Sequence, residues 1–344
     1  MELYGRSWTR RELEAHIGKL EQIGGIRRFE CAEGPEKGTE IIQVRTGAGL
    51  SYTVSPTKGL DLSLAEFGGT PISWQAAGGD IHPMYYEPEG AGWLRTASGG
   101  LLMTCGLMHA GWTAEHDGRQ FGLHGRVHHT PARQVAAEGQ WSGDDYDMRI
   151  SGTMEETALF GGHLRMRREI RSRLGENRIT ITDTVENAGF EPCPHMILYH
   201  FNFGFPLLSE SAELTFPPGT VQPREAETPL KDYDRWQEPT AGYLERCYYH
   251  KPDALRQRVS ANIRQPQFPQ AGGRYIPLNV TLSWGTDTLP QLVQWKLPAE
   301  GAHVLGIEPA NCGMDGAPPE EADRLRVMLQ PGEQVRYDLE LNIG

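Results

Sequence analysis

Three stretches of the sequence carry side chains that could do acid–base chemistry. The first is FGLHGRVHHTPA, residues 121–132, which places His124 between two glycines. An imidazole gains and loses a proton near neutral pH. Gly122 and Gly125, close to it on either side, allow a tight backbone, so we expect His124 to face a cleft. On a strand, His128 would share the face of His124, and His129 would point away.

The second and third stretches combine an imidazole and a carboxylate with very apolar neighbours. In PHMILYHFNFGFPLL, residues 194–208, His200 and Asn202 are two apart and fall on one face of a strand, with aromatic residues on the other. Polar groups in such a segment are costly unless they are paired or functional. In HVLGIEPANCGMDG, residues 303–316, Glu308 follows a short apolar strand and precedes Pro309. We expect this carboxylate to point into a pocket.

Other kinds of site are less well supported. Histidines with the spacing H-x3-H-H could bind a metal, but no carboxylate nearby completes a ligand set, and we expect no metal. The sequence has no G-x-S-x-G motif, no Walker A motif and no G-x-G-x-x-G stretch that opens a helix. A serine nucleophile and a nucleotide cofactor are therefore not indicated.

The elements that must position these residues are mostly strands. Alternating apolar residues predict strands in NRITITDTVENAG (177–189), GEQVRYDLELNIG (332–344) and HLRMRREIRSRL (163–174). In the last of these, Leu164, Met166, Arg168 and Ile170 share one face. The content of 41 Gly and 24 Pro suits many short strands joined by turns. Thr9 and Glu12 form a capping-box pattern, which predicts one N-terminal helix over about 9–23. We expect one domain, residues 1–344, built as a large antiparallel β-sandwich.

Composition limits the partners and the compartment. The formal net charge of −12 disfavours nucleic acid and anionic membrane surfaces. No apolar run is long enough to span a membrane, and the N-terminus lacks the apolar segment of a secretory signal. Five dispersed cysteines without a CxxC pair are typical of free thiols in a reducing compartment. We expect a cytoplasmic protein, whose oligomeric state the sequence leaves open.

The order of these motifs resembles that of the aldose 1-epimerase (galactose mutarotase) superfamily, and in particular a bacterial aldose-epimerase-like branch. A His-Gly comes first, a His-aromatic stretch follows, and a glutamate after a late strand comes last. The resemblance extends from SYTVSPTKGLDLSLAEFGGTPISW, residues 51–74, to the C-terminus. It implies a large antiparallel β-supersandwich, in agreement with the strand pattern.

The resemblance also implies roles for individual residues. His124 would bind the sugar, His200 would act as general acid and Glu308 as general base. Arg95 and Asn202 would hold sugar hydroxyls. Relatives often have a glycine where this sequence has Arg126, so Arg126 and His128 are candidate contacts for an anionic group, and the sugar stays open. Relatives also use an aspartate between the second histidine and the glutamate, and Glu245 is the candidate named for that place.

These residues fit mutarotation, the exchange of the α and β anomers of a sugar. The reaction needs an acid and a base and no cofactor. The expected partner is a small sugar or sugar derivative. Two alternatives remain open at this stage. One is a carbohydrate-binding protein without turnover, and the other is a metal-dependent sugar isomerase or lyase built on His124, His128, His200 and Glu308.

Overall fold

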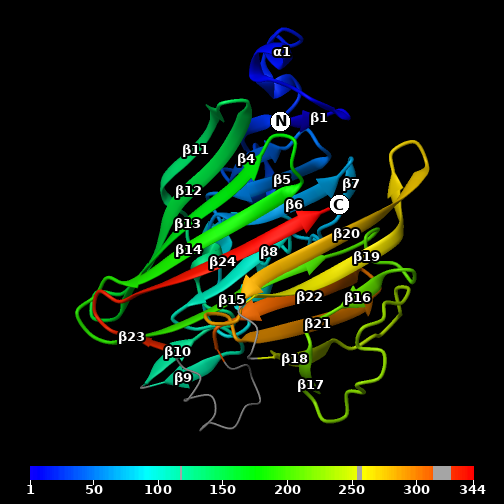
Figure 1. Cartoon of the computed structure of the whole chain (residues 1–344). Coiled ribbons are helices and arrows are strands. Elements are labelled where there is room, and N and C mark those ends of the chain that lie inside the picture. Colours follow the sequence, from blue (N-terminus) through cyan, green and yellow to red (C-terminus); the bar gives the residue numbers. More distant parts are fainter. Residues whose placement is uncertain (117, 254–257, 313–326) are drawn as a thin grey trace.

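Two large antiparallel β-sheets form most of the chain (Figure 1). The computed structural model describes residues 1–116, 118–253, 258–312 and 327–344. The predicted all-β, antiparallel supersandwich is therefore confirmed. That the chain is one domain stays a prediction.

The strands of each large sheet are not arranged in chain order. The eight-stranded sheet consists of β11 (Arg133–Ser142), β12 (Asp145–Thr157), β13 (His163–Arg173), β14 (Arg178–Asn187), β24 (Gln334–Ile343), β20 (Arg274–Gly285), β19 (Arg258–Gln270) and β16 (Glu213–Thr215). The twelve-stranded sheet runs through β17 (Gly219–Pro223), β18 (Arg246–Pro252), β21 (Gln291–Ala299), β22 (Ala302–Ala310), β15 (Cys193–Phe203), β8 (Leu102–Leu107), β6 (Asp61–Phe67), β5 (Leu50–Ser55), β4 (Glu40–Arg45) and β3 (Gly25–Glu30). Its two remaining strands are β7 (Thr70–Pro71), which pairs with β6, and β23 (Val327–Leu329), which pairs with β15.

The other elements are short. Two hairpins lie outside the large sheets, β1 (Glu2–Leu3) with β2 (Arg6–Ser7) and β9 (Ala114–His116) with β10 (Arg119–Phe121). Among the described residues, the single α-helix is α1 (Arg10–Glu14), and the 3-10 turns are η1 (Leu20–Gln22), η2 (Gly34–Glu36), η3 (Pro83–Tyr85), η4 (Gly92–Arg95) and η5 (Val127–His129). Within the described part of the chain, no helix is long and apolar enough to cross a bilayer.

The N-terminal helix has the predicted start but is shorter than the expected range 9–23. Thr9 caps it, and the capping box with Glu12 is present. The helix ends after Glu14 with Ala15 as its C-cap, and Gly18, a poor helix former, follows three residues later. A separate 3-10 turn, η1, then carries Leu20, which packs on the small cluster around Leu13.

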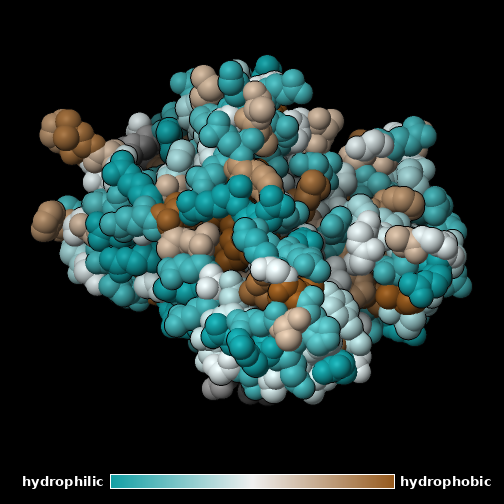
Figure 2. Space-filling view, turned by 90° about the horizontal axis from the view of Figure 1, so that it is seen from above, coloured by the Kyte–Doolittle hydropathy of each residue, from teal (hydrophilic) through white to brown (hydrophobic). Residues whose placement is uncertain are grey.

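The core lies between the two sheets and follows the predicted alternation. On β14, the side chains of Ile179, Ile181 and Val185 are buried and contribute to this core, while the threonines between them are partly exposed. The segment 163–173 is strand β13, as its period of two predicted. The molecular face seen in Figure 2 is mostly hydrophilic, with apolar side chains in small groups.

A charged cluster is buried in this core. Arg168, on the apolar face of β13, has a side chain with no exposed area and forms ion pairs with Asp61 (2.6 Å) and Asp183 (2.7 Å). Asp61 also accepts hydrogen bonds from the backbone N–H and the hydroxyl of Thr104 on β8. The Tyr199 hydroxyl on β15 donates to Asp183 at 2.8 Å. The cluster therefore ties β6, β8, β13, β14 and β15 together.

Loss of the Arg168 charge should destabilise the fold. Arg168→Met would leave two buried carboxylates without their cation, and breaking a buried pair in this way costs about 3–5 kcal/mol. Chemical denaturation with urea measures the loss. The matched control is Arg167→Met, one residue away on the exposed face of β13, which should cost about 1 kcal/mol or less. Equal losses in the two variants would contradict a structural role for the cluster.

Candidate functional site

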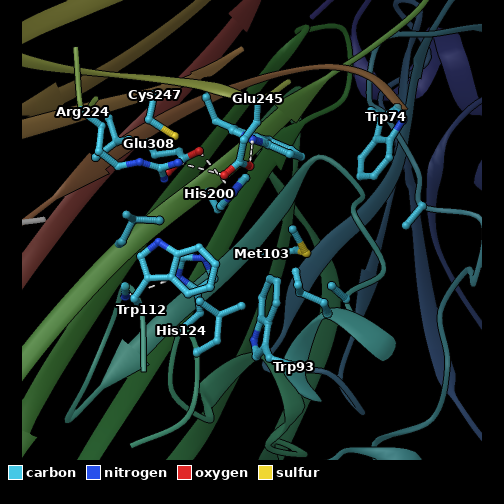
Figure 3. Close-up of a pocket in the computed structure, with 18 of the residues that line it drawn as sticks. Trp74, Trp93, Met103, Trp112, His124, His200, Arg224, Glu245, Cys247 and Glu308 are labelled. Atoms are coloured by element: carbon cyan, nitrogen blue, oxygen red, sulfur yellow. Dashed lines mark hydrogen bonds and ion pairs between the residues drawn. The ribbon is translucent and has the colours of Figure 1, made fainter. Parts of the chain in front are cut away.

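A cavity of about 240 Å³ opens on the face of the twelve-stranded sheet that points away from the core between the sheets (Figure 3). On β15, Tyr199 and Phe201 point into that core, while Leu198 and His200 line the cavity. The residues that line it are Trp74, Ala76, Trp93, Leu94, Ala97, Met103, Gly111, Trp112, Leu123, His124, Leu198, His200, Arg224, Glu245, Cys247, Tyr249, Val293, Trp295 and Glu308. Three residues predicted from the sequence, His124, His200 and Glu308, thus meet here.

The floor of the cavity is a single cross-strand row. Neighbouring strands place Tyr249 opposite Val293, Val293 opposite Glu308, and His200 opposite Met103. The register of β15 with β22 pairs Leu198 with Ala310 and Phe201 with Ile307, which sets His200 opposite Glu308. All five side chains of the row line the cavity. Opposed residues in antiparallel strands have close side chains, so the two predicted acid–base groups are direct neighbours.

Glu308 lies within β22 rather than after its end, because the strand continues to Ala310. Its carboxylate is almost fully buried, and Oε1 lies 3.1 Å from His200 Nε2 without the alignment of a hydrogen bond. Gly306 leaves space for it, since a Cβ at that position would lie too close to Glu308 Oε1. A side chain at Gly306 would therefore displace the carboxylate.

Burial changes the proton affinity of both groups. Desolvation, with a smaller contribution from the charge of Glu245, raises the pKa of Glu308 well above its ordinary value. Desolvation lowers the pKa of His200 to about 4, against a smaller opposing effect of Asn202. Burial therefore favours the uncharged forms of both groups, a protonated Glu308 and a neutral His200.

His124 faces the pair from the opposite wall. It lies in a left-handed turn, with φ of 55°, instead of the strand considered from the sequence. Desolvation lowers the pKa of His124 to about 3, and its Nδ1 accepts a hydrogen bond from the Gly111 N–H at 3.4 Å. The neutral ring therefore carries its proton on Nε2 and can donate it to a ligand. The His124 and His200 rings are 6.0 Å apart.

A second polar group at the cavity was largely missed by sequence reasoning. Arg224 Nη2 lies 2.9 Å from Glu245 Oε1, and Trp295 Nε1 donates to Glu245 Oε2 at 2.9 Å. Glu245 thus lines the cavity, while Arg224 and Trp295 had not been considered. A signal for part of the set was present, because Glu245, Cys247 and Tyr249 alternate along the chain as the residues of one strand face do.

Four predicted contact residues do not line the cavity. Asn202 follows His200 on the strand, but its amide donates to the backbone oxygens of Gly100 and His200. Arg95 is exposed and pairs with Glu87 at 3.0 Å. Arg126 is exposed, just before η5.

His128 is the fourth of these residues, and its position corrects the expected shared face with His124. The chain turns at His124 and continues as the 3-10 turn η5, so the two imidazoles separate. His128 is buried, with Nδ1 2.7 Å from Asp61 Oδ2 and Nε2 3.2 Å from Ser98 Oγ. It belongs to the buried charged cluster. His129 contacts Thr96 at 2.8 Å. Among the described residues, no three His, Cys, Asp or Glu side chains are grouped as metal ligands.

Comparisons with known proteins agree with this fold. A family model described as "Domain of unknown function (DUF4432)" matches residues 36–343. No curated protein matches the chain. A Klebsiella pneumoniae crystal structure described as a "putative aldose 1-epimerase" is 27% identical, with a TM-score of 0.82 over 92% of this chain and 83% of that one.

Two more distant structures share the fold. A galactose mutarotase-like protein from Clostridium acetobutylicum is 12% identical, with a TM-score of 0.60 over 94% of this chain and 99% of that one. A galactose 1-epimerase from Lactobacillus acidophilus is 14% identical, with a TM-score of 0.55 over 93% and 98%. The resemblance to the aldose 1-epimerase superfamily expected from the sequence is confirmed as a likeness of fold.

The raised pKa of Glu308 should appear as pH-dependent stability. The folded chain holds a proton on Glu308 that the unfolded chain releases near pH 4.5, so the wild type loses stability as the pH rises above that value. Glu308→Gln removes this loss. Its stability relative to wild type should therefore be higher at pH 8 than at pH 5, by about 1.4 kcal/mol for each pH unit of this range that lies below the folded-state pKa.

Urea denaturation at both pH values provides the measurement. Glu213→Gln, which changes a surface glutamate paired with Arg264, is the control and should show the same difference from wild type at pH 5 and pH 8. If Glu308→Gln behaved in the same way, the carboxyl group would titrate normally in the folded state.

Proposed function

We propose a function from the site itself, because the chain belongs to a family described as a domain of unknown function (DUF4432). The protein is an aldose 1-epimerase, which interconverts the α and β anomers of a sugar without a cofactor. The observation that carries this proposal is the buried pair of Glu308 and His200, whose Oε1 and Nε2 atoms lie 3.1 Å apart at the floor of an open cavity.

Anomer exchange needs one acid and one base at the same time. Glu308 takes the proton from the C1 hydroxyl, the C1–O5 bond breaks, and His200 gives a proton to the ring oxygen. The product is the open-chain aldehyde. After rotation about the C1–C2 bond, O5 attacks the other face of C1, His200 recovers its proton and Glu308 returns the first one. Nothing is oxidised or reduced, and the pair ends with the proton count with which it began.

The shared proton suits this cycle. The resting form has the proton on Glu308, and the reactive form has it on His200. These two forms differ only by a transfer between atoms 3.1 Å apart. A sugar that enters the cavity brings hydroxyl groups that can stabilise the ionised Glu308. Since both forms contain one proton, the pair can serve either direction of the exchange.

Other cavity side chains fit the binding of a sugar ring. His124 Nε2 is a donor opposite the pair, and Glu245, fixed by Arg224 and Trp295, is an acceptor. Trp93 and Trp112 offer aromatic surface for the C–H face of a pyranose. Arg224, the cation that lines the cavity, is already paired with Glu225 and Glu245. Its charge is therefore not needed to bind a ligand, and an uncharged sugar fits the site.

The same aromatic lining also favours a second candidate, a sugar-binding protein without turnover. The two candidates differ in what the pair does. A binding protein would hold its ligand equally well with Glu308 and His200 replaced by polar residues of similar size. Measurements of anomer exchange in variants of the pair separate the two candidates.

Replacement of either member of the pair should abolish most anomer exchange. Glu308→Gln and His200→Asn should each lower kcat/KM roughly 10²- to 10⁴-fold, because each removes a proton-transfer group. Magnetisation-exchange NMR over a panel of aldoses measures the rate. Glu213→Gln is the surface control and should match wild type. Sugar binding without any exchange faster than buffer would instead support the binding protein.

The pH profile should differ from that of an ordinary histidine. The one-proton state of the pair is lost to acid when His200 takes up a second proton, near pH 4, and lost to base when Glu308 gives up its proton. We expect kcat/KM to fall below about pH 4, to be higher above pH 5, and to fall again on the basic side as Glu308 ionises. Circular dichroism at each pH serves as the control for unfolding. A decline centred near pH 6.5 would contradict the assignment.

A further inference from the structure

One side of the cavity is built from apolar side chains. The apolar lobe consists of Trp74, Ala76, Trp93, Leu94, Ala97 and Met103. The polar groups of these side chains are the indole N–H groups of Trp74 and Trp93, and no carboxylate, amide, hydroxyl or imidazole group is among them. The indole N–H of Trp93 is covered and not open to the cavity. Figure 3 shows Met103, Trp93 and Trp74 on one side of His200, with Glu308 and Arg224 on the other.

The strand order places this lobe beside His200, on the side away from Glu308. Glu308, His200 and Met103 occupy one row on three consecutive strands, β22, β15 and β8. Neighbouring strands are about 4.8 Å apart, so the three side chains follow one another along one line in the order Glu308, His200, Met103. A pyranose with its C1 hydroxyl at Glu308 and its ring oxygen at His200 has C5 next in line. The group attached to C5 then points at Met103.

The apolar side chains of the lobe favour a methyl group over a hydroxymethyl group on C5. A hydroxymethyl group would bring its O6 hydroxyl against methionine, alanine, leucine and tryptophan side chains. A buried hydroxyl without a partner costs free energy, whereas a methyl group gains contact with the same surfaces. The opposite orientation, with the ring oxygen at Glu308, would direct the C5 substituent toward Arg224 and Glu245 and would favour a hydroxyl.

We propose that the apolar lobe binds the exocyclic group on C5 and that the preferred substrates are 6-deoxyaldoses, which carry a methyl group there. This inference rests on the proposed function, because it uses the roles of Glu308 and His200. It adds the chemical class of the substrate and makes Met103, which follows His200 in the row, a residue that determines specificity.

The test compares matched sugars that differ only in the O6 hydroxyl. Suitable pairs are D-fucose with D-galactose, L-fucose with L-galactose, L-rhamnose with L-mannose, and 6-deoxy-D-glucose with D-glucose. The catalysed anomer exchange of each is measured by NMR and corrected for the uncatalysed rate. In the pairs that react, kcat/KM should be roughly tenfold or more higher for the 6-deoxy sugar, the cost of one buried unpaired hydroxyl.

Variants at Met103 test the assigned contact. Met103→Gln keeps the length of the side chain and supplies an amide, so the preference for the deoxy sugar should shrink toward unity. Met103→Leu keeps an apolar side chain and is the matched control, which should retain the preference. Because the measured quantity is a ratio of two substrates for one protein, a general loss of activity or stability does not change it.

The possible failures can be told apart. Equal or greater kcat/KM for the hydroxymethyl sugar in every reactive pair would overturn this inference and leave the proposed function intact. A ratio that does not change in Met103→Gln would remove Met103 from the contact and overturn the placement of C5. Absence of exchange with all eight sugars would overturn the proposed function and this inference together.

Discussion

The site depends on the register of three neighbouring antiparallel strands. β22, β15 and β8 are aligned so that Glu308, His200 and Met103 stand side by side on one face of the sheet. A slip of one residue along a strand would turn its side chains to the opposite face and would put Ile307 or Phe201 in the cavity. Burial by the surrounding loops then gives the aligned pair its unusual proton affinities. Without this register, His200 and Glu308 would not lie 3.1 Å apart.

The opposite face of the same strands contains groups that hold this register. Thr104 follows Met103, and Tyr199 precedes His200; the two are themselves paired across β8 and β15. Thr104 is hydrogen-bonded to Asp61, and Tyr199 to Asp183, while Arg168 joins both carboxylates. Burial opposes ionisation of Asp61, yet the His128 hydrogen bond and the Arg168 charge hold its pKa below the ordinary value. Such a cluster tolerates only one arrangement of its members, because any unpaired charge left in the core is costly.

Likeness of fold and likeness of site are separate observations here. The structures compared share the architecture at 12–27% identity, and one fold can hold many functions. Particular side chains of this chain, and not the fold, therefore support a function. Of the eight residues selected from the sequence, His124, His200, Glu245 and Glu308 line the cavity, while Arg95, Asn202, Arg126 and His128 do not. Arg224 and Trp295 line it without having been selected.

The pattern of residues along the sequence correctly predicted those features that a single strand or helix start determines. Alternation along 163–173 and 178–187 marked the strands and their buried faces, and Thr9 with Glu12 marked the helix start. The polar His200 within an apolar strand was recognisable because burying it without a purpose is costly. Only the tertiary structure decided which distant residues meet. His128 and Arg168 joined a buried ionic cluster, Arg95 paired at the surface with Glu87, and Arg224 came to the cavity beside Glu245. The reason is that strand pairing between segments far apart in the chain sets these contacts, whereas the spacing of residues along one segment sets only the face on which each side chain lies.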